Sequence, residues 1–230
     1  MVNSAISRQE KLLKSGDKKA ASAIEILKQV AAPLNEGVAV RSTMRNLAPE
    51  AWEVVKPLNL LTAKPMLYVA NVAEKDAANP DIPLVRKVQE IASAEGTVAV
   101  PICGLIESQI ATLSSDEERV EYLEAVGLKE PGLHKLIRAS YALLGLITFF
   151  TVGPKEDRAW TVRKGSTAPQ AAGQIHTDFE RGFIRAEVIG YDDFITCKSE
   201  AVAREKGKLR VEGKEYIVHD GDLMHFRFSV

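Results

Sequence analysis

A strand-helix-strand pattern between residues 66 and 103 constrains the fold of this chain more than any other feature. Apolar residues fill positions 66–70 and 98–103, as expected for buried central strands. A helix is predicted over 83–94, because this segment opens with proline and ends before a glycine. One face of that helix carries three apolar residues: Leu84, Val88 and Ile91. Strands joined in this way lie parallel with a right-handed crossover, so the centre of the chain is predicted to be α/β.

Asn71 follows the first of these strands directly. In open parallel sheets, ligands bind at the carboxyl ends of the strands, so this asparagine is well placed to contact one. In nucleotide-binding domains of this class, such an asparagine can bond a purine ring. A carboxylate three residues later, here Glu74, can then select which purine is accepted. Asparagine is also common as a plain turn residue, so the spacing alone leaves both interpretations open.

Residues 1–55 are predicted to be helical and lack any strand pattern. Ser15-Gly16-Asp17 predicts the end of one helix and the start of another, because glycine suits the left-handed position after a helix and aspartate caps free N–H groups. We therefore expect an antiparallel helical hairpin. Its second helix should pack through an apolar stripe: Ile24, Leu27, Ala31 and Leu34. Pro33 is expected to kink or end that helix.

Residues 146–230 change pattern again and are predicted to form a compact α+β module, with a boundary near Gly145. Strands are expected at five places: 146–151, 159–162, 184–188, 215–218 and 223–228. The polar connection over 153–157 suits a hairpin between the first two strands. One helix is predicted over 168–180, with three side chains turned inward: Ala171, Ala172 and Ile175. Between the two modules, helices are predicted over 116–126 and 131–144, the first capped by Ser115 or Asp116.

Composition limits the classes of function that the chain can have. The 230 residues are 46% apolar with a formal net charge of −1, and no apolar run approaches the roughly 20 residues needed to span a bilayer. The N-terminus lacks the apolar core of a secretory signal, so a cytoplasmic protein is expected. The small net charge argues against nucleic-acid binding by the whole surface, while local basic patches stay open. Cys103 and Cys197 are expected to be reduced, structural thiols.

The motifs that the sequence lacks exclude several kinds of chemistry. It contains no Gly-x-x-x-x-Gly-Lys-Ser/Thr, so no loop of backbone N–H groups is available to cradle phosphates or to place Mg²⁺. His176-x-Asp178, with His219 and His225 downstream, has the composition of a two-histidine, one-carboxylate iron site, which would make the chain an oxygenase. The commoner alternative is structural, because the residues before His176 read as helix and Asp178 suits a cap or a turn.

Three segments resemble the YchF or Obg-like ATPase family, and the resemblance covers nearly the whole chain. Residues 60–74, which include Asn71-Val72-Ala73-Glu74, are similar to the Asn-x-x-Glu base-recognition segment of that family. This segment stands where GTPases carry Asn-Lys-x-Asp, and it is associated with a preference for ATP over GTP. Residues 158–186 resemble the family's C-terminal TGS domain, a ubiquitin-like β-grasp module, and residues 220–228 fit the end of that domain.

The resemblance implies three domains and a function. Residues 1–55 would be a coiled-coil-like helical hairpin, 56–145 the C-terminal part of a P-loop NTPase domain with a partial parallel sheet, and 146–230 the TGS domain. ATP and Mg²⁺ would be the cofactors, with slow hydrolysis and association with ribosomes. Carried over by position, Asn71 and Glu74 would recognise the base, with the backbone around Val72 accepting the adenine amino group. Residues 103–107 take the place of the second base-proximal loop, where Gly104 and Leu105 depart from the family's pattern.

Members of that family begin with a strand, a phosphate loop and switch segments, and this sequence begins after all of them. Half of the parallel sheet is therefore expected to be missing, and we expect no ATP hydrolysis by this chain alone. A gene fragment, a mis-assigned start and a truncated paralogue stay open as explanations. The edge of the truncated sheet either stays unpaired or is covered by a second copy or another partner.

A binding module is the alternative to an ATPase part. The TGS domain and the helical hairpin would then engage a ribosome or RNA without catalysis. Five basic residues are candidate phosphate contacts: Arg158, Arg163, Lys164, Arg181 and Arg185.

Overall fold

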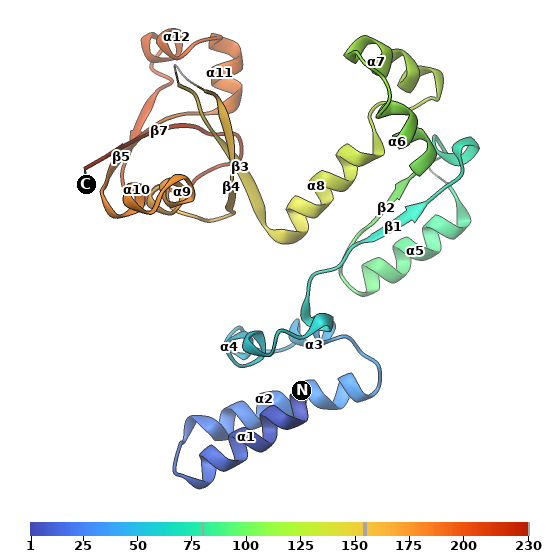
Figure 1. The fold of residues 1–230 in the computed structure, drawn as a ribbon, viewed down its shortest axis with the longest axis vertical. Helices are drawn as coiled ribbons and strands as arrows, with labels where there is room; N and C mark the ends of the chain where they lie inside the picture. Colours follow the sequence, from blue (N-terminus) through green and yellow to red (C-terminus); the bar gives the residue numbers. More distant parts are fainter. Residues whose placement is uncertain (80, 154–155, 230) are drawn as a thin grey trace. The chain divides into compact units, whose positions relative to one another are not determined.

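The computed structural model describes residues 1–79, 81–153 and 156–229. These residues form two compact units, Met1–Lys135 and Leu136–Val230. Figure 1 shows the course of the chain through both units. None of the helices that the structure describes is long and apolar enough to cross a membrane.

The first unit opens with the predicted helical hairpin. Helices α1 (Val2–Lys14) and α2 (Lys19–Asn35) lie side by side (Figure 1). Gly16 adopts a φ of +97° in the turn, a left-handed conformation that glycine tolerates without a Cβ clash. The carboxylate of Asp17 accepts a hydrogen bond from the backbone N–H of Lys19 at 2.9 Å, so the turn residues act as predicted.

Two short helices, α3 (Val40–Met44) and α4 (Ala51–Val55), complete the core of this helical part. The buried side chains of that core come from all four helices and from the segment that follows: Val2, Leu27, Val30, Val40, Met44, Ala51, Val55 and Leu60. Val30 is fully buried although the predicted stripe left it out. Helix α2 runs two residues beyond Pro33, because a proline in the last turn removes only one hydrogen bond.

The central β-α-β unit is present as predicted. Strand β1 (Tyr68–Asn71) pairs in parallel with β2 (Ala99–Ile102), and helix α5 (Pro83–Ala94) connects them. The predicted inward face of α5 is wrong in part. Val85 and Ala92 are buried, whereas Leu84 is 77% exposed and Ile91 is 49% exposed. A sheet of two strands is narrow, so it covers only part of the apolar surface that the helix offers.

Three 3₁₀ turns and three helices make up the rest of this region. The turns are η1 (Lys56–Leu58), η2 (Leu61–Ala63) and η3 (Glu74–Asp76), and the helices are α6 (Gly104–Ile110), α7 (Asp116–Ala125) and α8 (Gly132–Leu144). Helix α6 starts directly after β2, where the sequence suggested a loop. Its buried residues Ile106 and Ile110 are four apart and pack with Cys103 and Leu123, and this packing fixes a helix too short to be stable by itself.

The second unit is built on a mixed sheet of five strands in the order β4-β3-β7-β5-β6. Its strands are β3 (Leu146–Thr151), β4 (Arg158–Arg163), β5 (Phe183–Ile189), β6 (Arg210–Glu212) and β7 (Leu223–Phe228). Strands β3 and β7 are parallel, and the other neighbours are antiparallel. The predicted strand over 215–218 is wrong, since Ile217 makes only an isolated bridge to Thr167, and β6 was missed. In the predicted hairpin connection, Pro154 and Lys155 lie outside the described residues.

Helices cover the sheet of the second unit on both faces. Helix α9 (Ala168–Ile175) packs Ala168, Ala171 and Ala172 against one face. The single helix predicted over 168–180 is divided, because His176 is extended (φ −160°, ψ 142°) and α10 (Thr177–Arg181) begins after it. Val188 and Met224 join this core, and their strand neighbours Ile189 and Leu223 face the other way. There they form a second core with α11 (Tyr191–Cys197) and α12 (Glu200–Glu205), two helices that the sequence did not predict.

Candidate base-recognition site and basic residues

Asn71 lies at the carboxyl end of β1, and its side chain joins the ends of the two parallel strands. The register pairs Asn71 with Ile102, so the chain leaves both strands at the same edge. The side-chain oxygen of Asn71 accepts a hydrogen bond from the backbone N–H of Gly104 at 3.0 Å. Within the part of the chain that the structure describes, this assignment of the amide leaves its NH₂ group free to donate to an acceptor such as a ring nitrogen. The structure therefore brings together the two segments to which the family resemblance assigned base recognition.

Gly104 suits this contact without being indispensable. A Cβ atom added at Gly104 would lie 3.5 Å from the side-chain oxygen of Asn71, which is an ordinary van der Waals distance. The neighbouring Leu105 is 54% exposed. The contact spans 33 residues of sequence, so no local pattern could have identified Gly104 as the partner of Asn71.

Val72 and Glu74 lie next to Asn71 and have different surroundings. The backbone N–H of Val72 donates to the carbonyl of Ile102 at 2.8 Å, and its side chain packs on the Cys103 and Ile106 cluster. Glu74 opens the turn η3 and is exposed. Burial raises the pKa of the Tyr122 hydroxyl, and the negative charge of Glu74 raises it further. Glu74 is therefore close enough to Tyr122 of α7 to interact with it electrostatically.

A cavity of about 310 Å³ opens beside these residues. Asn71, Val72 and Ala73 line it on the strand side, and Val85 and Val88 of α5 line it on the helix side. The volume is near the lower end of the roughly 300–1,000 Å³ that small-molecule sites occupy. Polar groups at the end of a strand thus border an apolar wall that could receive the face of a planar ring.

Glu107 joins the start of α8 to α6, a role that no local sequence pattern indicated. Its carboxylate accepts from the backbone N–H groups of Gly132 at 2.7 Å and Leu133 at 3.2 Å, which fixes the start of α8 to α6. A Cβ atom at Gly132 would lie 2.7 Å from Ile102, so only glycine allows this close approach.

The five basic residues do not form one patch. Arg158, Arg163 and Lys164 lie on or directly after the edge strand β4, whereas Arg181 and Arg185 lie at the end of α10 and on β5. Two strands, β3 and β7, separate β4 from β5, which puts about 14 Å between them at a spacing of about 4.8 Å per strand. The guanidinium of Arg158 lies 4.3 Å from the centre of the Trp160 ring and 4.0 Å from the carboxylate of Glu156.

Arg185 has a basic neighbour that the sequence did not reveal, because Arg227 of β7 is directly opposite it in the register. Arg227 and Arg204 both approach Glu187, at 3.5 Å and 3.1 Å. Burial acts to raise the pKa of Glu187, but the two guanidinium groups outweigh it and hold that pKa below its ordinary value of 4.5. This part of the sheet is therefore an ion-pair network as well as a basic surface.

The histidines of the alternative iron site have separate local roles. His176 accepts from the backbone N–H of Asp178 at 3.2 Å and so caps α10. His219 is 3.0 Å from the hydroxyl of Tyr216, and His225 is 2.7 Å from the carboxylate of Glu200. Within the residues that the structure describes, no group of three or more His, Cys, Asp or Glu side chains could hold a metal ion.

Comparison with known proteins gives a consistent set of similarities. A family model named YchF-GTPase_C, described as a protein of unknown function, matches residues 146–229. The ribosome-binding ATPase YchF of Haemophilus influenzae is 52% identical over 226 residues, which are 98% of this chain and 61% of that protein. The protein of the same name from Bacillus subtilis is 47% identical over 230 residues, which are 100% of this chain and 62% of that protein.

A solved structure shows the same likeness in three dimensions. The Schizosaccharomyces pombe YchF GTPase matches with a TM-score of 0.83 at 31% identity, over 98% of this chain and 62% of that one. The chain thus spans about three fifths of the length of the relatives that it matches.

Proposed function

Because this chain belongs to the YchF family over the length that it spans, we propose that it carries the base-recognition part and the ribosome-contacting part of an ATP-binding, ribosome-associated ATPase. The relatives are named ribosome-binding ATPases, and we extend that activity to the whole protein of which this sequence would form a part. In this proposal the protein is cytoplasmic, and residues 146–230 form a TGS domain with the β-grasp fold.

The hydrogen bond between Asn71 and Gly104 is the observation that supports base recognition most directly. It holds the asparagine amide at the edge where both parallel strands end, with its NH₂ group free for a purine ring nitrogen. Glu74 is exposed three residues later and is an acceptor when ionised. Together with the carbonyl groups near Val72, it would favour adenine, whose 6-amino group donates, over guanine, whose 6-oxygen accepts.

The phosphates and Mg²⁺ have no comparable support from the residues of this chain. Mg²⁺ in nucleotide sites is held by one or two carboxylates together with the phosphates. Among the described residues, no group of three or more His, Cys, Asp or Glu side chains could hold a metal ion, and the sequence contains no phosphate loop. We therefore assign no residue of this chain to Mg²⁺ and expect no ATP turnover by the chain alone.

Nuclear magnetic resonance titration of the isotope-labelled chain with adenosine and guanosine tests the base site. Adenosine should shift the backbone amides of Val72 and Gly104, with a dissociation constant of about 1 mM or weaker, because a base contributes only a few hydrogen bonds and one stacked face. Guanosine should bind about tenfold more weakly.

A matched pair of variants assigns the selectivity. Glu74→Gln adds a donor where the proposal needs an acceptor, so the preference for adenosine should fall toward unity. Glu90→Gln removes an exposed charge from α5 at a residue that does not line the cavity, and it should leave the preference unchanged. Equal binding of the two nucleosides to the unmodified chain, or shifts confined to other residues, would rule out the proposed role.

Ribosome contact through the basic residues is the second candidate function. The names of the relatives favour it, and so does the exposure of Arg163 and Lys164 beside each other at the end of an edge strand. Phosphate contacts of this kind add affinity that falls steeply as salt is raised. In this view the second unit binds without catalysing a reaction.

Co-sedimentation with purified ribosomes at increasing salt tests this candidate. The double variant Arg163→Ser, Lys164→Ser should dissociate from the ribosomes, and so be lost from the pellet, at a lower salt concentration than the unmodified chain. A charge-matched control, Lys206→Ser with Lys214→Ser, removes two exposed lysines from other loops and should behave like the unmodified chain. If the unmodified chain is absent from the pellet even at low salt, the candidate is wrong.

A further inference from the structure

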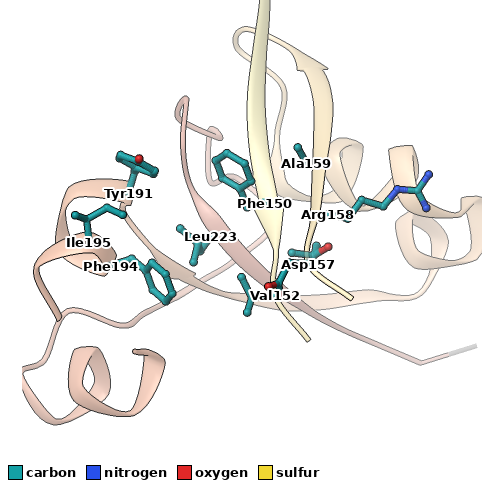
Figure 2. Close-up of a pocket in the computed structure, with 10 residues that line it drawn as sticks. Phe150, Val152, Asp157, Arg158, Ala159, Tyr191, Phe194, Ile195 and Leu223 are labelled. Carbon is teal, nitrogen blue, oxygen red and sulfur yellow. The ribbon is translucent and has the colours of Figure 1, made fainter. Parts of the chain in front are cut away.

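The second unit contains a cavity whose lining is largely apolar and also carries two cations. It has a volume of about 970 Å³ and is lined by residues from three segments, 137–148, 164–165 and 217–220; we call it the α8 cavity. A smaller apolar pocket of about 360 Å³ lies between β3, β4 and α11 (Figure 2). The charged lining of that pocket is one aspartate and one arginine, so it favours neither sign of charge in a ligand. The α8 cavity differs from it in this respect.

The walls of the α8 cavity are apolar and include one aromatic side chain. Ile137 and Tyr141 come from α8, Leu146 from β3, and Ile217 from the segment that precedes β7. Ile137 is 46% exposed and Ile217 is 43% exposed, so these walls are accessible from solvent. The hydroxyl of Tyr141 lies 3.4 Å from that of Thr161 on β4, and this contact fixes one end of the tyrosine side chain. A tyrosine held at the wall of an open cavity is suited to stack on a planar ring such as a nucleobase.

The charges at the α8 cavity are mainly positive. Arg138 and Lys164 line it, and Arg163 directly precedes Lys164 in the sequence. Neither Arg163 nor Lys164 forms an ion pair with another residue that the structure describes. The carboxylate in the lining, that of Asp220, already accepts a hydrogen bond from the backbone N–H of Thr148 at 2.8 Å. The cavity is therefore better suited to a ligand that carries negative charge than to a cationic one.

We propose that the α8 cavity binds one unpaired nucleotide of single-stranded RNA, with its base against Tyr141 and the flanking phosphates on Arg163 and Lys164. This nucleotide site rests on the ribosome contact proposed above and specifies its chemistry. Bases in a duplex are stacked within the helix, whereas those of a single strand can be splayed out onto aromatic side chains. The volume is near the upper end of the roughly 300–1,000 Å³ that small-molecule sites occupy, which leaves room for a base together with its ribose.

Two fluorescent probes of equal length and charge test the nucleotide site on the full chain. One is a short oligouridine, and the other is an abasic ribose-phosphate chain that has the same number of phosphates but no bases. Fluorescence anisotropy at low salt should show that the oligouridine binds about fivefold more tightly or better, because stacking on an aromatic side chain contributes at least this factor for one base. Equal binding of the two probes would overturn the proposal, since phosphate contacts alone do not distinguish them.

Two pairs of variants locate the bound base within the molecule. Tyr141→Leu removes the aromatic ring and should weaken oligouridine binding about fivefold, whereas Tyr191→Leu removes a half-exposed tyrosine that does not line the α8 cavity and should have no effect. Ile217→Asp places a carboxylate in the cavity wall at an exposed position, so it should fold and should also weaken binding. Its control is Val211→Asp, which adds the same charge on β6. Unchanged binding in both cavity variants, or an equal loss in the two controls, would contradict the assignment.

The same variants separate the nucleotide site from the ribosome contact on which it rests. If Arg163→Ser with Lys164→Ser weakens ribosome binding, but Tyr141→Leu and Ile217→Asp bind oligouridine as the unmodified chain does, the cations contact phosphates and the nucleotide site is wrong. If the chain prefers oligouridine to the abasic probe through Tyr141 but is absent from the ribosome pellet, the nucleotide site is supported and the ribosome contact is wrong.

Discussion

Asn71 and Glu187 show how one polar side chain can join segments that are far apart in the sequence. Asn71 links the ends of β1 and β2 through Gly104. Glu187, 11% exposed on β5, accepts from Arg204 of α12 and Arg227 of β7. In both places the partners come from different elements, so the side chain fixes the relative position of those elements.

Glu187 should make the stability of the second unit depend on pH. Its pKa is lowered in the folded state, because Arg227 and Arg204 outweigh the effect of burial. The stabilisation is therefore complete above the ordinary value of 4.5 and is lost as the pH falls through the lower folded value. At about pH 6 the free energy of unfolding of Glu187→Gln should be lower than that of the unmodified chain. This difference should become smaller as the pH is lowered to about pH 3.

Urea unfolding of the two chains at several pH values measures this difference. Glu205→Gln, at an exposed residue near the end of α12, is the control and should show a difference that does not change with pH. A difference for Glu187→Gln that stays constant or grows toward acid pH would contradict the predicted role.

The sequence allowed the position of Asn71 to be predicted, but not its partners. Asn71 directly follows an apolar run, and the end of a strand can be located from local pattern alone. The hydrogen bonds of Gly104 to Asn71 and of Glu107 to Gly132 cross 33 and 25 residues of chain, so no local pattern could reveal these partners. The sequence also could not show how far apart the basic residues lie, because the strand order that places β3 and β7 between Arg163 and Arg185 is known only from the structure.

Elements with strong local patterns were predicted well, and short ones were not. Helix α5 has the predicted bounds, since proline and glycine mark its ends. Strand β6 has only three residues, and a pattern of period two cannot be recognised in so few. The predicted strand over 215–218 has the right burial, with Val218 buried and Tyr216 packed on the core. Its backbone bonds instead to Ser166 and Ala168 in a connecting segment, so it forms no ladder.

A capping box formed by Ser115 and Glu118 closes the start of α7. The hydroxyl of Ser115 accepts from the N–H of Glu118 at 3.1 Å, and the carboxylate of Glu118 accepts from the N–H of Ser115 at 3.3 Å. Ser115→Ala should lower the unfolding free energy by about 1 kcal/mol, the usual cost of losing such a cap.

Ser114→Ala is a matched control, because Ser114 contributes only its backbone N–H to Glu118. Chemical denaturation followed by circular dichroism should place this control within about 0.5 kcal/mol of the unmodified chain. Equal effects of the two substitutions would show that the capping box contributes no stability.

In the whole molecule, the two units have separate hydrophobic cores, and their sheets differ in size. The second unit contains a five-stranded sheet with helices on both faces. The sheet of the first unit has only two strands, which are marginal without the helices that pack on them. The chain spans about three fifths of the length of the relatives that it matches.

Residues 136–230 should fold when produced alone. They include the last nine of the thirteen residues of α8. In this part of the helix, Ile137 and Tyr141 border a cavity with Leu146 and Ile147, and the hydroxyl of Tyr141 lies 3.4 Å from that of Thr161. A shorter piece that begins at residue 146 lacks these contacts and should unfold at a lower temperature. Thermal unfolding of both pieces checks this, and an unfolded spectrum for residues 136–230 would contradict the independence of the second unit.

In the proposed function, this chain recognises a base but contributes nothing to holding its phosphates. A nuclear magnetic resonance titration that compares ATP with Mg²⁺ against adenosine tests it most directly, with the Gly104 amide as the reporter. The two ligands should bind with dissociation constants within about threefold of each other, both near 1 mM or weaker. Submicromolar binding of ATP, or any turnover by the purified chain, would contradict the claim.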